Sequence, residues 1–153
     1  MFISMYNKRT VVFREDFMNT QALQHLKTYF GYDTFRPGQT QIIESVLSNK
    51  DTLVIMPTGG GKSLCYQIPA LCLEGTTLVI SPLISLMKDQ VDMLTSSGIP
   101  AAFINSSLSF DEVQDVMYAV RSGKIKLLYI APERLENERF CMELAQIKVP
   151  LLA

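Results

Sequence analysis

The sequence lacks the features that would point to a membrane, secreted or zinc-binding protein. None of its apolar runs approaches the roughly 18 residues that a membrane span requires, and its N-terminus has no secretion-signal pattern. Its three cysteines, Cys65, Cys72 and Cys141, form no C-x-x-C pair, which argues against a disulfide framework and a zinc site. These absences predict a cytoplasmic protein with reduced thiols and no membrane partner.

An excess of charge of one sign is also missing, since 14 Lys and Arg against 15 Asp and Glu give a net charge of −1. The net charge gives no overall positive potential that would indicate a nucleic-acid partner. Any nucleic-acid binding would therefore come from local hydrogen-bond donors. The single histidine, His25, has no evident second ligand and is predicted to be a surface residue. A chain of 153 residues that is 48% hydrophobic predicts about one globular domain.

The sequence does have a glycine-rich segment, residues 56–63, directly after the apolar residues 52–55. A strand that runs into a glycine loop and then a helix holds nucleotide phosphates, because backbone N–H groups converge on the phosphate oxygens. The ammonium of Lys62 would reach the β- and γ-phosphates as the catalytic residue, and the Ser63 hydroxyl would take one position on Mg²⁺. The predicted phosphate-binding residues are Thr58, Gly59, Gly60, Gly61, Lys62 and Ser63.

One position departs from the general phosphate-loop pattern G-x-x-x-x-G-K-S/T. Met56 stands where the pattern has glycine, so the match is to the shorter core G-x-G-K-S. A glycine-rich turn that caps a helix by accident is the alternative interpretation.

The rest of the chain alternates between helical and strand patterns. Residues 1–17 show no sustained period and are predicted to be a poorly ordered extension, so the domain is expected to cover residues 18–153, with its first helix beginning at Asn19. Ser109 and Glu112 form a capping-box signature for a later helix. Strands are predicted at residues 52–55, 77–80, 101–104, 126–130 and 149–153. This order predicts an α/β fold with a parallel sheet covered by helices on both faces.

Four blocks resemble the RecQ family of ATP-dependent DNA helicases, and they occur in the family's order. They are residues 30–39, 56–70, 81–91 and 129–135, so the resemblance covers roughly residues 20 to 153. Four blocks are far more specific than a phosphate loop alone, and helicases of this superfamily are similar in using its shorter core. The resemblance implies the first RecA-like phosphate-loop domain of such a helicase.

The resemblance also implies a base-binding block upstream of the phosphate loop. Tyr32 and Arg36 would hold adenine between them, and Gln39 would hydrogen-bond its polar edge, so ATP is the expected nucleotide. Packing between the N-terminal helices is the alternative for Tyr32 and Phe35, and we prefer it for Phe35 only.

Two segments at strand ends resemble the family's grip on single-stranded DNA. Hydroxyls, backbone N–H groups and cations there would contact phosphates without reading bases. The predicted DNA-binding residues are Ser81, Pro82, Leu83, Ser85, Lys88 and Arg134. Residues 105–107 either join this surface or serve as a loop and helix cap.

In the family, the strand that begins here at Val149 leads into an Asp-Glu-x-His box, which holds Mg²⁺ and orients the attacking water. This chain ends at Ala153, before that box and before a second RecA-like domain. We therefore expect a domain, incomplete at its C-terminus, that binds ATP but hydrolyses it negligibly by itself. In a longer parent the resemblance implies 3′ to 5′ DNA unwinding in recombination and repair.

Two other interpretations stay open at this point. One is a stand-alone nucleotide- or DNA-binding module, and the other is a different phosphate-loop enzyme such as a small-molecule kinase or GTPase. Nothing in the sequence indicates an oligomeric state.

Overall fold

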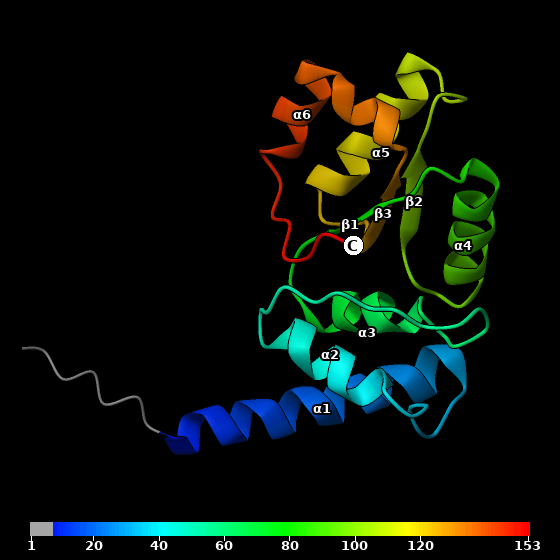
Figure 1. Ribbon diagram of the computed structural model, residues 1–153. Coiled ribbons are helices and arrows are strands. Elements are labelled where there is room, and N and C mark those ends of the chain that lie inside the picture. The colour runs from blue at the N-terminus through cyan, green and yellow to red at the C-terminus, as the bar shows by residue number, and fades with distance from the viewer. Residues whose placement is uncertain (1–7) are drawn as a thin grey trace, which may run out of the picture. The chain divides into compact units, whose positions relative to one another are not determined.

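The computed structural model describes residues 8–153, and Figure 1 shows the order of its helices and strands. The chain divides into two compact units, Met1–Cys72 and Leu73–Ala153. Within residues 8–153, no helix combines the length and the apolar character needed to cross a membrane.

The first unit contains three helices in its described residues, α1 (Lys8–Phe30), α2 (Gln39–Leu47) and α3 (Leu64–Cys72). These helices bury apolar side chains against one another, which removes that surface from water. The buried core consists of Ala22, Leu26, Ile43 and Ile68, and Phe35 packs against it. The packing role predicted for Phe35 is confirmed.

The predicted start of the first helix at Asn19 is wrong, because α1 begins at Lys8. Residues 8–17, which the sequence analysis placed in a poorly ordered extension, are therefore helical. Residues 1–7 of that extension lie outside the described residues. The domain boundary at residue 18 stays a prediction.

The predicted strand at residues 52–55 is also wrong. Leu53 and Ile55 are each 90% exposed, and none of the strands in the described part of the chain pairs with this segment. Thr52 is instead tied back by its hydroxyl, which hydrogen-bonds to Ser45 Oγ and to the carbonyl oxygen of Lys50, both at 2.9 Å. A strand requires a neighbour that completes its backbone hydrogen bonds, so an apolar pattern alone does not make one.

The second unit contains a parallel sheet in the strand order β1-β3-β2. The strands are β1 (Thr77–Ile80), β2 (Ala101–Ile104) and β3 (Leu127–Ile130). Ile80 and Ile104 both pair with Ile130, so the three carboxyl ends are level. The three strands and their parallel pairing confirm the sequence prediction.

The predicted strand at residues 149–153 contributes an isolated bridge rather than a full strand. Leu152 pairs with Leu78 in a parallel bridge, and Leu78 N–H donates to the carbonyl oxygen of Leu151 at 3.0 Å. The prediction of five strands is therefore reduced to three strands and this bridge within the described residues.

Helices cover both faces of this sheet, as predicted. They are α4 (Ile84–Ser96), α5 (Phe110–Arg121), the short 3-10 helix η1 (Pro132–Glu136) and α6 (Glu138–Leu144). Met117 of α5 and Phe140 of α6 join Leu128 and Ile130 in one core. Figure 1 shows α4 on the side of β2 away from α5 and α6.

The start of α5 is the predicted capping box. The Ser109 hydroxyl accepts the Glu112 N–H at 3.3 Å, and the Glu112 carboxylate accepts the Ser109 N–H at 2.8 Å. The hydrogen bond from the Ser109 backbone holds the pKa of Glu112 below its ordinary value. These two bonds satisfy donors that the first turn of a helix leaves open.

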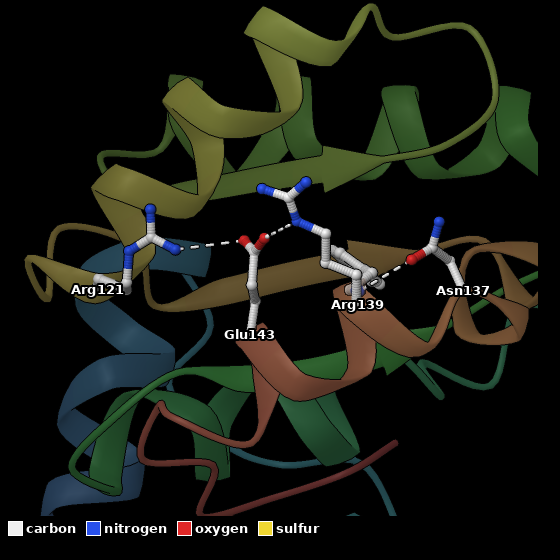
Figure 2. A network of polar contacts seen from close by, with 5 residues as sticks. Arg121, Asn137, Arg139 and Glu143 are labelled. Carbon is white, nitrogen blue, oxygen red and sulfur yellow. Dashed lines mark hydrogen bonds and ion pairs between the residues drawn. The ribbon is translucent and has the colours of Figure 1, made fainter.

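A polar network on the surface joins α6 to α5 (Figure 2). The carboxylate of Glu143 lies 3.4 Å from Arg121 Nη1 and 3.6 Å from Arg139 Nε. Asn137 caps α6 by accepting the Phe140 N–H at 3.0 Å. Ion pairs near the surface contribute little stability, and only the Arg121 pair joins the two helices, because Arg139 and Glu143 both belong to α6.

Candidate functional site

The glycine-rich loop, residues 56–63, leads directly into the first turn of α3. Gly60 N–H donates to the carbonyl oxygen of Pro57 at 3.1 Å, and Leu64 N–H donates to that of Gly61 at 3.2 Å. Gly59 and Gly61 have φ angles of 78° and 79°, which side chains on an L-residue disfavour. The loop therefore has the compact turn and the helix N-terminus that anion binding requires.

The ammonium of Lys62 lies across this loop. Its Nζ donates to the carbonyl oxygens of Met56 at 3.0 Å and of Pro57 at 3.2 Å. The ammonium is thus held among oxygen acceptors at the start of the loop. Phosphate oxygens would be charged acceptors in place of these neutral carbonyls, and such charge-assisted bonds are stronger.

Two residues of the predicted base-binding block contact the same loop. Arg36 Nη1 donates to the carbonyl oxygen of Gly59 at 2.6 Å. Gln39 is 1% exposed, and its amide donates to the carbonyl oxygen of Gly61 at 3.1 Å while accepting the Arg36 N–H at 2.8 Å. The two blocks, 22 and 23 residues apart in the sequence, therefore form one hydrogen-bonded site.

The other predicted nucleotide residues are exposed or half-buried. Tyr32 is 52% exposed, which is compatible with a stacking surface for a base. Thr58 is exposed and Ser63 is half-buried. Ser63 precedes α3, and its carbonyl oxygen accepts the Gln67 N–H at 2.9 Å, which leaves its hydroxyl at the helix N-terminus.

Two electrostatic effects act close to this site. Lys27 and Asp33 form an exposed ion pair at 2.8 Å, whose hydrogen bond lowers the pKa of Asp33 and raises that of Lys27. Burial raises the pKa of the Cys65 thiol, which faces the carbonyl oxygen of Gly61. Cys65 therefore stays protonated at neutral pH and acts as a packing residue.

The predicted DNA-contacting segments lie in the second unit, at the carboxyl edge of the sheet. Ser81 follows β1, and its hydroxyl accepts the Leu83 N–H at 3.4 Å. Pro82, Leu83, Ser85 and Lys88 are exposed, with Leu83 at 58%. Five of the six predicted residues therefore lie in the loop after β1 and the first turns of α4.

Arg134, the sixth residue, lies in η1 and is engaged with another loop. Its guanidinium donates to the carbonyl oxygens of Asn105 and Leu108, in the segment that follows β2. The sequence did not predict the hydrogen bonds that Arg134, Arg36 and Gln39 donate to other loops. Backbone carbonyl oxygens are the acceptors in all three cases, and every residue has one, so the amino-acid pattern contains no signal for them.

Comparisons with known proteins agree with this geometry. A model of the family described as DEAD/DEAH box helicase matches residues 36–149. The ATP-dependent DNA helicase RecQ of Pasteurella multocida (strain Pm70) is 52% identical over 151 residues, which is 99% of this chain and 24% of that protein. The protein of the same name from Bacillus subtilis (strain 168) is 56% identical over 134 residues, which is 87% of this chain and 23% of that protein. The chain thus spans about a quarter of the length of these relatives.

Proposed function

We propose that this chain, which belongs to the DEAD/DEAH box helicase family, is the ATP-binding part of an ATP-dependent DNA helicase similar to RecQ. Its parallel sheet with helices on both faces has the RecA-like fold class expected of that family. The observation that carries the proposal is the hydrogen-bonded site in which Arg36 and Gln39 meet the glycine-rich loop of Lys62.

Each residue of this site has a role that its chemistry supports. Tyr32 and Arg36 hold adenine by stacking and cation–π contact. The glycines and Thr58 surround the phosphates, and Lys62 neutralises the β- and γ-phosphates during transfer. Gln39 is 1% exposed and bonded to Gly61 and Arg36, so its amide would have to turn toward the base to offer the adenine edge a donor and an acceptor.

The Ser63 hydroxyl fits a Mg²⁺ ion that is held mainly by the nucleotide. Mg²⁺ prefers oxygen ligands and keeps several waters beside substrate phosphates, so one hydroxyl is a sufficient protein contribution on this side. Within residues 8–153, no three His, Cys, Asp or Glu side chains gather as a metal site of their own. The ion supplies charge neutralisation, and Ser63 orients it.

DNA is the proposed second ligand, bound as a single strand through its backbone. Half-buried Ser81 and exposed Ser85 offer hydroxyls, Pro82 and Leu83 offer apolar surface, and Lys88 offers a cation. Arg134 lies at the same edge of the sheet. Such a surface grips phosphates and sugars without reading sequence. In the longer protein, ATP-driven steps would move this grip 3′ to 5′ along the strand during recombination and repair, in the cytoplasm.

The test of the proposed function is ATP hydrolysis by the full-length protein with and without oligothymidylate. We expect a rate that rises with single-stranded DNA and negligible hydrolysis by residues 1–153 alone, because transfer needs further positioned groups. An ATP hydrolysis rate that does not change with DNA would favour a different phosphate-loop enzyme. No hydrolysis by the full-length protein would favour a binding module.

Gln39→Ala provides a test of the adenine site. We expect ATP to outcompete GTP in the unmutated chain and the preference to shrink in Gln39→Ala, because the amide that reads the base is lost. Competition against a fluorescent ATP analogue measures both affinities. Gln41→Ala, an exposed glutamine on the same helix, is the matched control, and equal affinities for ATP and GTP in the unmutated chain would contradict the assignment.

A further inference from the structure

The loop that joins β2 to α5, residues 105–108, has a shape set by one buried side chain. Asn105 is 1% exposed, and its Oδ1 accepts the Ser107 N–H at 2.9 Å and the Ser107 hydroxyl at 2.6 Å. The Leu108 N–H donates to the Asn105 carbonyl oxygen at 3.4 Å. The loop is therefore a compact turn that exposes Ser106 and Ser107.

Arg134 holds the same loop through its backbone. Its Nε donates to the Asn105 carbonyl oxygen at 3.0 Å, and its Nη2 donates to that oxygen and, at 3.3 Å, to the carbonyl oxygen of Leu108. The planar guanidinium thus joins the segment after β3 to the loop after β2. A lysine ammonium has the charge but cannot reproduce this fork of donors.

The charge of Arg134 is not matched by a carboxylate. Among the ion pairs of residues 8–153, none includes Arg134, and its partners are neutral carbonyls. The Ser106 side chain is exposed on this loop, close to the positive charge of Arg134, whereas the Ser107 hydroxyl hydrogen is already donated to Asn105 Oδ1. A hydroxyl donor beside a cation suits phosphate oxygens and carries no base preference.

The sheet places this loop in line with the segments proposed to contact DNA. Ser81 N–H donates to the Ile130 carbonyl oxygen at 3.1 Å, and Ala131 N–H donates to that of Ile104 at 3.0 Å. Since the strand order is β1-β3-β2, the segments after β1, β3 and β2 follow one another along one edge. A nucleic-acid backbone laid along this edge meets all three.

We infer that Arg134 is a positioning residue that shapes residues 105–108 into a contact for the DNA backbone, and that it does not itself bind a phosphate. The inference rests on the proposed function, since it assigns a role within single-stranded DNA binding. The contacting group is then the hydroxyl of Ser106, and Arg134 acts through the carbonyls of Asn105 and Leu108.

The first test compares Arg134→Lys with Arg134→Met in the full-length protein, using labelled oligothymidylate as the probe. We expect both variants to bind it about fivefold or more weakly, with lysine no better than methionine, because the fork is lost in both. The dependence of affinity on salt between about 50 and 200 mM should keep its slope, because no phosphate contact is removed. A lysine variant that binds normally, with a methionine variant whose salt slope falls by about one, would show a direct phosphate contact and overturn the inference.

A double-mutant cycle with Ser106→Ala separates positioning from general damage, because Ser106 is exposed whereas the Ser107 hydroxyl itself helps to shape the loop. Ser106→Ala should weaken oligothymidylate binding in the unmutated background and have little further effect in Arg134→Lys, because the loop is already displaced. Additive losses would overturn the inference. Since Ser106→Ala and Arg134→Lys are mild changes, the cycle decides the question even if Arg134→Met does not fold.

Two controls keep the inference distinct from the proposed function. Arg139→Lys, whose guanidinium pairs with Glu143 on α6, should bind oligothymidylate normally. In DNA-stimulated hydrolysis, Arg134→Lys should raise the DNA concentration for half-maximal rate and leave the rate at saturating DNA unchanged. An unmutated protein that fails to bind oligothymidylate overturns the proposed function as well, whereas normal binding by Arg134→Lys overturns the positioning role alone.

Discussion

Lys62→Ala is expected to lower the rate of ATP hydrolysis by the full-length protein about 10²–10³-fold, the usual loss when one positioned charge-stabilising donor is removed. ATP binding should weaken as well, because the ammonium proposed to meet the β- and γ-phosphates is gone. The ammonium is already among the loop oxygens, bonded to the carbonyls of Met56 and Pro57. Nucleotide titration and a phosphate-release assay measure the two effects.

Lys50→Ala is the matched control for this prediction. Lys50 is an exposed lysine that precedes the loop, and it is not among the residues proposed to bind the nucleotide. Its removal should leave binding and hydrolysis unchanged. Superimposable ATP titration curves for Lys62→Ala and the unmutated chain would remove Lys62 from its assigned role.

Gly61→Ala is expected to weaken ATP binding about tenfold. The loss has two causes, backbone strain at a positive φ and displacement of the Gln39 side chain. An added Cβ would lie 2.5 Å from Nε2 of Gln39, and the φ of 79° is unfavourable for alanine. The Gln39 amide must then move, which breaks its 3.1 Å bond to the Gly61 carbonyl. Titration with ATP and with GTP tests this, and selectivity should fall together with affinity.

Gly59→Ala separates the steric effect from backbone strain. Gly59 has nearly the same φ, 78°, but an added Cβ there meets no atom within 4 Å. We therefore expect a smaller loss of ATP affinity than in Gly61→Ala. The effect of Gly61→Ala should also shrink in a Gln39→Ala background, and equal losses in both backgrounds would show that the Gln39 contact is unimportant.

Signals between near neighbours in the sequence predicted the structure well. The capping box needs only Ser109 and Glu112, three positions apart, and the structure has both of its hydrogen bonds. The loop residues Gly59 and Gly61 adopt the positive φ angles that a glycine run permits. In each case one turn of chain contains every atom that the interaction requires.

Sequence patterns whose structure depends on residues far away in the chain gave wrong predictions. Residues 52–55 have the apolar composition of a strand, yet the described chain offers them no pairing neighbour, and Leu53 and Ile55 remain exposed. The predicted start of α1 was too late because residues 8–17 mix charged and apolar residues without a sustained apolar period. Pairing and exposure are properties of the folded chain.

The amino-acid sequence alone was sufficient to predict which chemical groups would form a nucleotide site, because the spacing of the glycines, Lys62 and Ser63 is a local property. Tertiary structure alone showed what the long polar side chains bind. Arg36, Gln39 and Arg134 all donate to backbone carbonyls between 22 and 29 residues away. Every residue has such a carbonyl, so residue identity cannot reveal which one will lie within hydrogen-bonding distance.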